Sequence, residues 1–214
     1  MSRILSVRKQ RGVVYVECED ETVLRVPASL FRERPLREGE PWDPEAYAAW
    51  LAGREYPHAL ARAVDYLAAR PRTEREMETC LRRCGYTEPA IARVMERLLR
   101  EGYLNDAQFA DLWAQARQER ALGKRRIAQE LLRKGVSRER IDAALAQVDD
   151  AEQLRQAVAL CERLIARTRA RDERDARRKV LAALVRRGYG WDVARQAYSR
   201  AAGTDDGGFD EWDG

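Results

Sequence analysis

The chain has 214 residues, of which 45% are hydrophobic, 36% are charged and only 7% are aromatic, and its formal net charge is +4. This mix favours a helical protein with large solvated faces and argues against a compact barrel. No apolar run approaches the roughly 18 residues of a membrane span, and strand-like sequence follows Met1 directly, so we expect a soluble, cytoplasmic protein.

The first segment is predicted to form two or three short β-strands. Residues 3–27 contain runs of β-branched and aromatic residues, and Glu19-Asp20-Glu21 supplies a turn between the last two runs. Strands this short need a second layer, so we expect them to pack on the helices that follow. A linker with prolines and a glycine leads to Asp43-Pro44, which starts a helix predicted to stop near Gly53.

The rest of the chain is predicted to be helices with explicit caps and stops. Thr73 and Glu76 form a capping box, Thr87 and Ser137 cap later helices, and glycines end several of them. The pattern predicts a mainly α fold of tandem, helix-turn-helix-like three-helix repeats in an elongated arrangement, with a small N-terminal β-bearing segment. We expect a strand head with its linker helix, three repeats and a disordered acidic tail, at residues 1–53, 54–104, 105–149, 150–203 and 204–214.

The most informative signal is a unit that recurs three times. In each copy a helix-like run ends in two cations close to a turn glycine, and a second amphipathic run follows. The turn glycines Gly85, Gly135 and Gly188 lie 50 and then 53 residues apart. A period of this size is typical of tandem units that cover one another's apolar faces. An array of similar surfaces favours binding over catalysis.

Charge is distributed unevenly along the chain. Residues 1–53 carry 8 cations and 9 anions, residues 54–203 carry 32 and 22, and residues 204–214 carry five acids and no base. A basic body with an acidic tail favours a polyanionic partner, or a protein that already coats one. The alternative is that many of the 36 arginines are simply solvated. The tail could be a solubiliser or a mimic that competes for basic patches.

The candidate binding residues are cations near the ends of one helix in each repeat. Those before the glycines have a second explanation, because the helix dipole stabilises cations at a helix C-terminus by ~0.3–1 kcal/mol each. Lys124-Arg125-Arg126 instead opens a helix, where the dipole disfavours cations, so we predict a phosphate-binding point there. The full candidate set for DNA or filament binding is Arg72, Arg75, Arg82, Arg83, Lys124, Arg125, Arg126, Arg133, Lys134, Arg177, Arg178, Arg186 and Arg187.

The sequence contains no recognisable catalytic or metal-binding pattern. Cys18, Cys80, Cys84 and Cys161 show no disulfide spacing, and His58 is the only histidine. We therefore expect no metal, no cofactor and thiols that are buried or neutral. Because the chain also lacks a glycine-rich phosphate loop and a pair of carboxylates flanking an apolar pocket, we predict no catalytic residues and no enzymatic activity.

Motifs in residues 66–74, 102–110, 123–131 and 134–136 resemble the bacterial RecX family of regulatory proteins. The resemblance covers roughly residues 59–148 well, and the head and third repeat match less specifically. Asn105 stands where the family usually has an acid, although asparagine can still cap a helix. The resemblance implies a fold of tandem three-helix repeats.

The resemblance also implies a function. The protein would modulate the RecA recombinase by lying along the groove of its filament on single-stranded DNA. It would restrain ATPase, strand exchange and co-protease activity in DNA repair and the SOS response. We expect a monomer that contacts the filament, single-stranded DNA and, as an open question, double-stranded DNA. The rival hypothesis is an autonomous helix-turn-helix nucleic-acid-binding regulator, but residues 89–100 and 138–147 lack the Asn and Gln cluster suited to reading bases.

Overall fold

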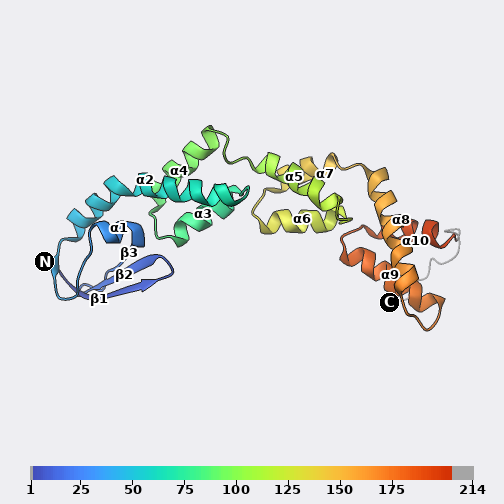
Figure 1. Ribbon diagram of the computed structural model, residues 1–214, viewed down its shortest axis with the longest axis horizontal. Coiled ribbons are helices and arrows are strands. Elements are labelled where there is room, and N and C mark those ends of the chain that lie inside the picture. The colour runs from blue at the N-terminus through green and yellow to red at the C-terminus, as the bar shows by residue number, and fades with distance from the viewer. Residues whose placement is uncertain (1, 204–214) are drawn as a thin grey trace. The chain divides into compact units, whose positions relative to one another are not determined.

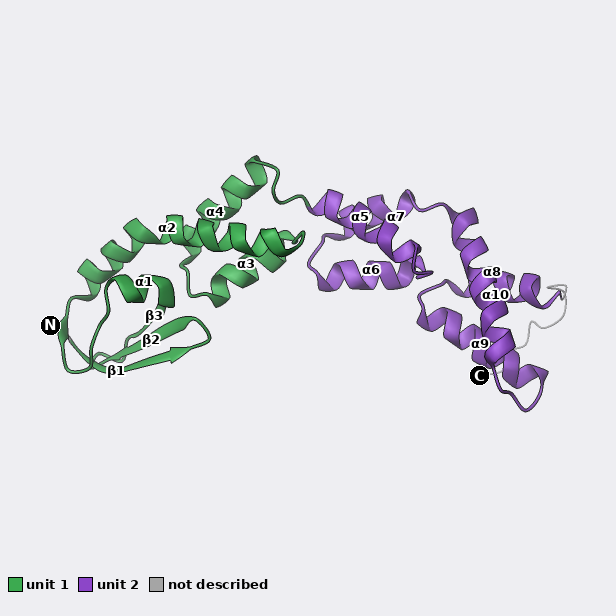
Figure 2. Ribbon diagram, viewed as in Figure 1, with its two compact units in different colours: residues 1–105 green, residues 106–214 purple. Residues whose placement is uncertain are grey.

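The computed structural model describes residues 2–203, so the acidic tail expected at residues 204–214 lies outside the described residues. The chain divides into two units, Met1–Asn105 and Asp106–Gly214 (Figures 1 and 2). Among the helices of residues 2–203, none is long and apolar enough to cross a membrane. The mainly helical fold with an N-terminal sheet is as predicted.

The first unit begins with an antiparallel sheet whose strand order is β3-β2-β1-β4. Strands β1 (Ser2–Gln10), β2 (Val13–Cys18) and β3 (Val23–Pro27) confirm the expected strands. Arg11 and Gly12 both have positive φ, at 49° and 89°, which suits the tight turn between β1 and β2. The short helix α1 (Ala28–Glu33) and the two-residue strand β4 (Pro41–Trp42) complete this part of the fold and were not predicted.

One long helix, α2 (Pro44–Ala69), follows the sheet. The Asp43 carboxylate accepts from the backbone N–H groups of Glu45 and Ala46, which confirms the predicted start. The predicted stop near Gly53 is wrong, because the helix continues through Gly53 and Pro57. Its buried residues recur every fourth position and form one uninterrupted face, so packing outweighs the local cost of glycine and proline: Tyr47, Leu51, Glu55, Ala59 and Ala63.

Glu55 is a buried acid on this face, with only 1% of its surface exposed. Its carboxylate accepts from the backbone N–H of Thr87 at 3.3 Å and from the Thr87 hydroxyl. Thr87 is the N-cap residue of the next helix, but its hydroxyl is used by Glu55. It forms no capping hydrogen bond with that helix, so the side-chain cap predicted there is absent. Burial raises the pKa of Glu55, and the two bonds from Thr87 oppose that shift only in part.

This raised pKa predicts how stability depends on pH. Between the unfolded and the folded pKa of Glu55, the folded chain holds more protons, so the free energy of unfolding falls as pH rises through that window. Glu55→Gln should flatten this part of the pH profile, as measured by urea unfolding from pH 4 to 8. The control is Glu96→Gln, at an exposed acid on α4 (Glu88–Arg100), which should retain the slope. An unchanged slope in the Glu55 variant would contradict the prediction.

Three three-helix units, a finer division than the two units of Figure 2, follow one another along the chain, as predicted. The first uses α2 with α3 (Glu74–Arg83) and α4, and the second uses α5 (Asp106–Gln118), α6 (Lys124–Arg133) and α7 (Arg138–Ala146). The third uses α8 (Asp150–Arg167), α9 (Glu173–Arg186) and α10 (Trp191–Ala202). Each unit has its own hydrophobic cluster, and the first cluster also takes in the sheet.

The middle helices α3, α6 and α9 end in the same turn. Gly85, Gly135 and Gly188 have φ of 88°, 88° and 93°, a conformation that favours glycine. The residue after each glycine donates its N–H to a carbonyl five residues earlier, which closes a Schellman motif three times. The carbonyls belong to fully buried leucines, so each turn is anchored in a core: Leu81, Leu131 and Leu184.

Candidate nucleic-acid interface

The repeated turn defines which cations occupy equivalent positions. Counting back from each glycine places Arg83, Arg133 and Arg186 at the last residue of their middle helices. Arg82 has no cationic counterpart, because Leu132 and Val185 stand at its position. Only one cation of each pair, the one two residues before the glycine, therefore occupies the same position in all three repeats. A second equivalent set lies eight residues earlier in each helix: Arg75, Arg125 and Arg178.

Four members of these two sets extend freely from the surface. Arg75, Arg83, Arg125 and Arg186 are exposed, and their side chains form no hydrogen bond or ion pair with residues 2–203. Arg133 is also exposed but donates to the carbonyl of Gln129 in its own helix. Eight residues of α-helix rise about 12 Å, so a middle helix can present two guanidinium groups separated by roughly this distance along its axis.

Other predicted site residues form ion pairs within the chain. Arg82 contacts Glu88 through two nitrogens at 2.6 and 3.0 Å. Lys124 Nζ lies 2.6 Å from Asp150, and Arg126 lies 3.4 Å from Glu130. Arg178 and Lys179 both bind the buried Asp175 at 2.7 Å, and these bonds hold the pKa of that carboxyl well below its usual range. These cations are already partly neutralised.

Three further candidates lie over aromatic rings. The Arg72 guanidinium is 3.8 Å from the centroid of the Tyr66 ring, Lys134 Nζ is 4.4 Å from that of Trp113, and Arg177 is 5.8 Å from that of Tyr198. Such cation–π contacts stabilise the cation at its ring by ~0.5–1 kcal/mol at exposed sites. These side chains therefore help to hold their own units together.

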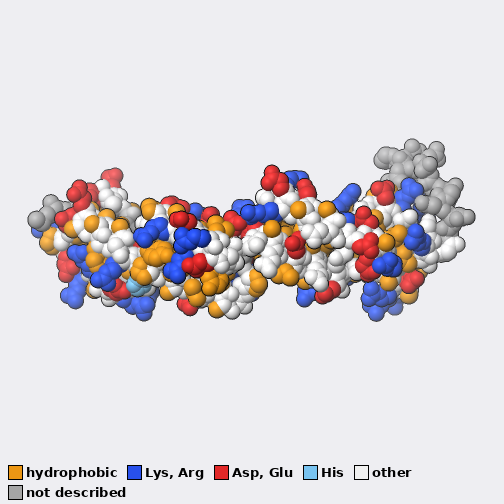
Figure 3. Space-filling view, turned by 90° about the horizontal axis from the view of Figure 1, so that it is seen from above, with side chains coloured by type: hydrophobic (Ala, Val, Ile, Leu, Met, Phe, Trp, Pro, Cys, Tyr) orange, Lys and Arg blue, Asp and Glu red, His pale blue; other side chains and the backbone are white. Residues whose placement is uncertain are grey.

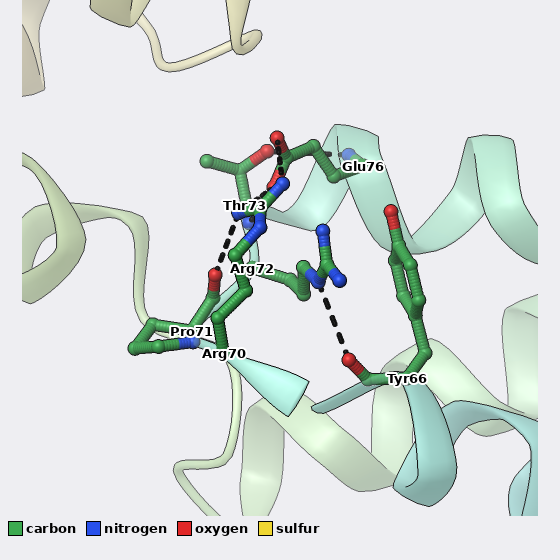
Figure 4. Close-up of polar contacts among 6 residues, drawn as sticks. All are labelled: Tyr66, Arg70, Pro71, Arg72, Thr73 and Glu76. Carbon is green, nitrogen blue, oxygen red and sulfur yellow. Dashed lines mark hydrogen bonds and ion pairs between the residues drawn. The ribbon is translucent and has the colours of Figure 1, made fainter. Parts of the chain in front are cut away.

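The link between α2 and α3 explains one of the sequence motifs (Figure 4). Arg72 Nε donates to the Tyr66 carbonyl, and Arg70 donates two bonds to the Glu76 carboxylate, each 3.1 Å long. Thr73 and Glu76 form the predicted capping box at the start of α3. Residues 66–76 thus connect two helices through several side-chain contacts, and Arg72 takes part in them.

The start of α6 differs from the predicted phosphate-binding point. The N–H groups of Gly123 and Arg125 donate to the carbonyls of Arg187 and Gly188, at 3.0 and 3.1 Å. The glycine turn of the third unit therefore occupies the end of this helix. A phosphate there could be held by side chains such as Arg125, but not by those backbone groups. The two bonds join residues 64 and 63 positions apart, and no local pattern in the sequence indicates them.

Basic and acidic side chains are interspersed within each unit on the face shown in Figure 3. This distribution matches the many ion pairs described above. The arrangement leaves exposed arginines at separate points of the surface. Residues 2–203 bring together no group of three or more histidines, cysteines or acids that could hold a metal ion.

Comparison with known proteins agrees with this repeat structure. Family models for the first, second and third three-helix domains of RecX match residues 59–98, 105–145 and 150–198. The regulatory protein RecX of Mycolicibacterium smegmatis is 35% identical over 172 residues, which are 78% of this chain and 92% of that protein. The regulatory protein RecX of Mycobacteroides abscessus is also 35% identical, over 85% of this chain and 84% of that protein.

Solved structures agree at the level of the fold. A crystal structure of regulatory protein RecX matches with a TM-score of 0.65 at 23% identity, covering 95% of this chain and all of that one. RecX from Lactobacillus salivarius gives a TM-score of 0.66 at 22% identity, over 70% of this chain and 98% of that one. From the three domain matches and the length of chain shared with its relatives, this protein belongs to the RecX family of regulatory proteins, which are not enzymes.

Proposed function

We propose that the chain binds, as a monomer, the RecA recombinase filament on single-stranded DNA and inhibits it. Binding would restrain ATP hydrolysis, strand exchange and co-protease activity without any reaction catalysed by the chain itself. The observation that carries this proposal is the set of free arginines, Arg75, Arg83, Arg125 and Arg186, at equivalent positions of successive units. Repeated cations suit a partner with repeated negative charge, such as a phosphate backbone within a filament.

The rival function, base-specific DNA binding by a single unit, has less support in the third helix of the first unit. Arg97 of α4 contacts Glu101 at 2.8 Å and the Tyr56 hydroxyl at 3.4 Å. Arg93 lies over the Tyr56 ring at 4.5 Å from its centroid. Side chains held in this way are not free to form the bidentate contacts that read base edges. The proposed contacts are therefore to backbone phosphate and protein rather than to bases.

The proposal is tested by titrating the chain into RecA filaments on single-stranded DNA while measuring ATP hydrolysis and strand exchange. Binding to bare single- and double-stranded DNA is measured in parallel by fluorescence anisotropy. We expect inhibition at chain concentrations below those that saturate bare DNA of either kind. Tight, sequence-dependent binding to duplex DNA with no effect on the filament would favour the rival function and refute ours.

A further inference from the structure

The proposed function leaves the outer face of the N-terminal sheet without a role. Val14 and Val16 of β2 belong to the hydrophobic cluster of the first unit. Because successive residues of a strand point to opposite faces of a sheet, Tyr15 and Glu17 point away from that cluster. The outer face therefore consists of the odd-numbered residues of β2 and their partners on the neighbouring strands.

One row of side chains on this outer face combines an aromatic ring with two cations. Tyr15 pairs with Arg8 of β1 on one side and with Arg25 of β3 on the other. Residues directly opposite one another in antiparallel strands have Cβ atoms about 4.5–5.5 Å apart. Both arginines are exposed and Tyr15 is half-buried, so the row presents a ring flanked by two guanidinium groups.

Other contacts hold both arginines away from the ring. Arg8 binds the carboxylate of Glu17. Arg25 donates to the carbonyl of Arg82, at the end of α3, at 3.2 Å. Within residues 2–203 the Tyr15 ring has no aromatic or cationic partner, whereas several other tyrosines of the chain have an arginine over the ring. The exposed side of the Tyr15 ring can therefore accept a flat group from outside the chain.

The first helical repeat extends the same face. The glycine turn after α3 lies against the β1–β2 hairpin (Figure 1), since a Cβ added to Gly85 would lie 3.1 and 3.2 Å from the two methyl groups of Val13. Val13 is on the same face of β2 as Tyr15. Arg83, two residues before this glycine, is exposed and forms no hydrogen bond or ion pair with residues 2–203. A free cation of the repeat therefore continues the basic row of the sheet.

We propose that this outer face binds single-stranded DNA by stacking one unpaired base on Tyr15. The flanking arginines bind the phosphates on either side of that base. Arg25 contributes more than Arg8, because its partner is a neutral carbonyl, whereas Arg8 is already paired with a carboxylate. Arg83 binds a phosphate further along the strand. The site rests on the proposed function only in that the filament presents the strand to it.

The chemistry of the row favours an unpaired strand over a duplex. An aromatic side chain can stack on any unpaired base, because every base has a π-face, and cations beside it bind the backbone. In a duplex both faces of each base are already covered by its neighbours, and only the base edges are accessible in the grooves. Phosphate contacts occur with either form of DNA, so the ring is what makes this face selective.

A photochemical crosslink on the unsubstituted, full-length chain tests the site directly. A single-stranded oligothymidine with 5-iodouracil in place of one thymine is irradiated together with the chain, and the crosslinked tryptic peptides are identified by mass spectrometry. We expect a crosslink in the peptide of residues 12–25, in which Tyr15 is the only aromatic residue. Because no residue is changed, the result does not depend on how a variant folds. Crosslinks only in other peptides would overturn the proposal.

Substitutions then identify the interaction. Tyr15→Leu keeps an apolar side chain but removes the ring, and should weaken binding of the full chain to a fluorescein-labelled single strand about tenfold, as expected for one stacked base. Tyr15→Phe keeps the ring and should bind like the parent. Tyr103→Leu is the matched control, at a tyrosine outside the sheet that is 65% exposed, and should also bind like the parent. Arg25→Gln should lower the salt-dependence slope by about 0.7.

These measurements use bare DNA, so they are separate from the test of filament inhibition. A chain that fails to inhibit the filament would refute the proposed function but would leave the crosslink and the affinities of the Tyr15 variants unaffected. Equal affinities of the parent and Tyr15→Leu would overturn the site, as would equal losses in Tyr15→Phe and Tyr15→Leu. A Tyr15→Leu variant that loses filament inhibition but binds bare single strands normally would mean that this face contacts protein, which would also overturn the site.

Discussion

Replacing Arg75, Arg83, Arg125 and Arg186 together with glutamine is expected to reduce filament inhibition at least tenfold, while stability falls only by the ~0.3–1 kcal/mol that a cation at each helix C-terminus contributes. These four side chains are exposed and form no hydrogen bond or ion pair within residues 2–203, so their loss removes no internal contact. If each binds one phosphate of single-stranded DNA, the slope of log affinity against log salt should fall by about 0.7 per residue, or about 2.8 in total. Titrations at several salt concentrations measure both quantities.

A variant with the same change in net charge serves as the control. Arg32, Arg37, Arg167 and Arg200 are exposed arginines outside the two equivalent sets, and their replacement by glutamine also removes four charges. This control should lose little inhibition and little salt dependence. Equal losses in the two quadruple variants would mean that overall charge, rather than the repeated positions, governs binding.

The four positions also separate binding from helix capping. Arg83 and Arg186 lie at helix C-termini, where loss of a cation should cost ~0.3–1 kcal/mol of stability. Arg75 and Arg125 lie in the first turns of α3 and α6, where the dipole gains nothing from a cation. Inhibition that survives loss of Arg75 and Arg125 would restrict the interface to the glycine turns.

Much of the fold follows from local sequence patterns. The glycine turns, the capping box of Thr73 and the Asp43-Pro44 helix start each depend on residues within one turn of helix, so a single sequence reveals them. The prediction that a helix ends near Gly53 was wrong because it used local signals alone. Glycine and proline disfavour a helix locally, but the buried face of α2 continues past both and is stabilised by contacts with distant parts of the chain.

The candidate site was less predictable than the fold. Composition and spacing identified the cations, but whether a cation is free depends on partners elsewhere in the chain. Lys124 contacts an acid 26 residues away, and Lys134 lies over the ring of Trp113. Packing between distant parts of the same chain therefore decides which cationic side chains are free to bind a partner.

Substitution of Gly188 by alanine is expected to separate the third three-helix unit from the second. A Cβ at Gly188 would lie 2.3 Å from the backbone N and the Cβ of Arg126, and the φ of 93° already disfavours alanine. Neither unit can yield easily, because the contact is between backbones. We expect a loss of about 2–3 kcal/mol, which for a unit of this size lowers the melting temperature by on the order of 10 °C.

Substitutions at two other glycines distinguish the effect of the steric clash from the effect of backbone strain. Gly123 has a φ of −75°, which alanine tolerates, yet its Cβ would lie 2.3 Å from the Gly188 carbonyl group. Gly102 has a φ of 75°, but nothing lies within 4 Å of its added Cβ. Gly123→Ala should therefore break the contact, and Gly102→Ala should cost only backbone strain of about 1 kcal/mol.

Hydrogen exchange then shows whether the interface itself has opened. The amides of Gly123 and Arg125 are protected by the carbonyls of Arg187 and Gly188, so either substitution at the contact should make Arg125 exchange much faster. The Ile127 amide, which donates to the Gly123 carbonyl within the helix start, should stay protected. Because Gly123 and Gly188 meet at one contact, the double variant should lose less stability than the sum of the single losses. Full additivity, with Arg125 still protected, would show that the two glycines act locally and that the units are held together by other contacts.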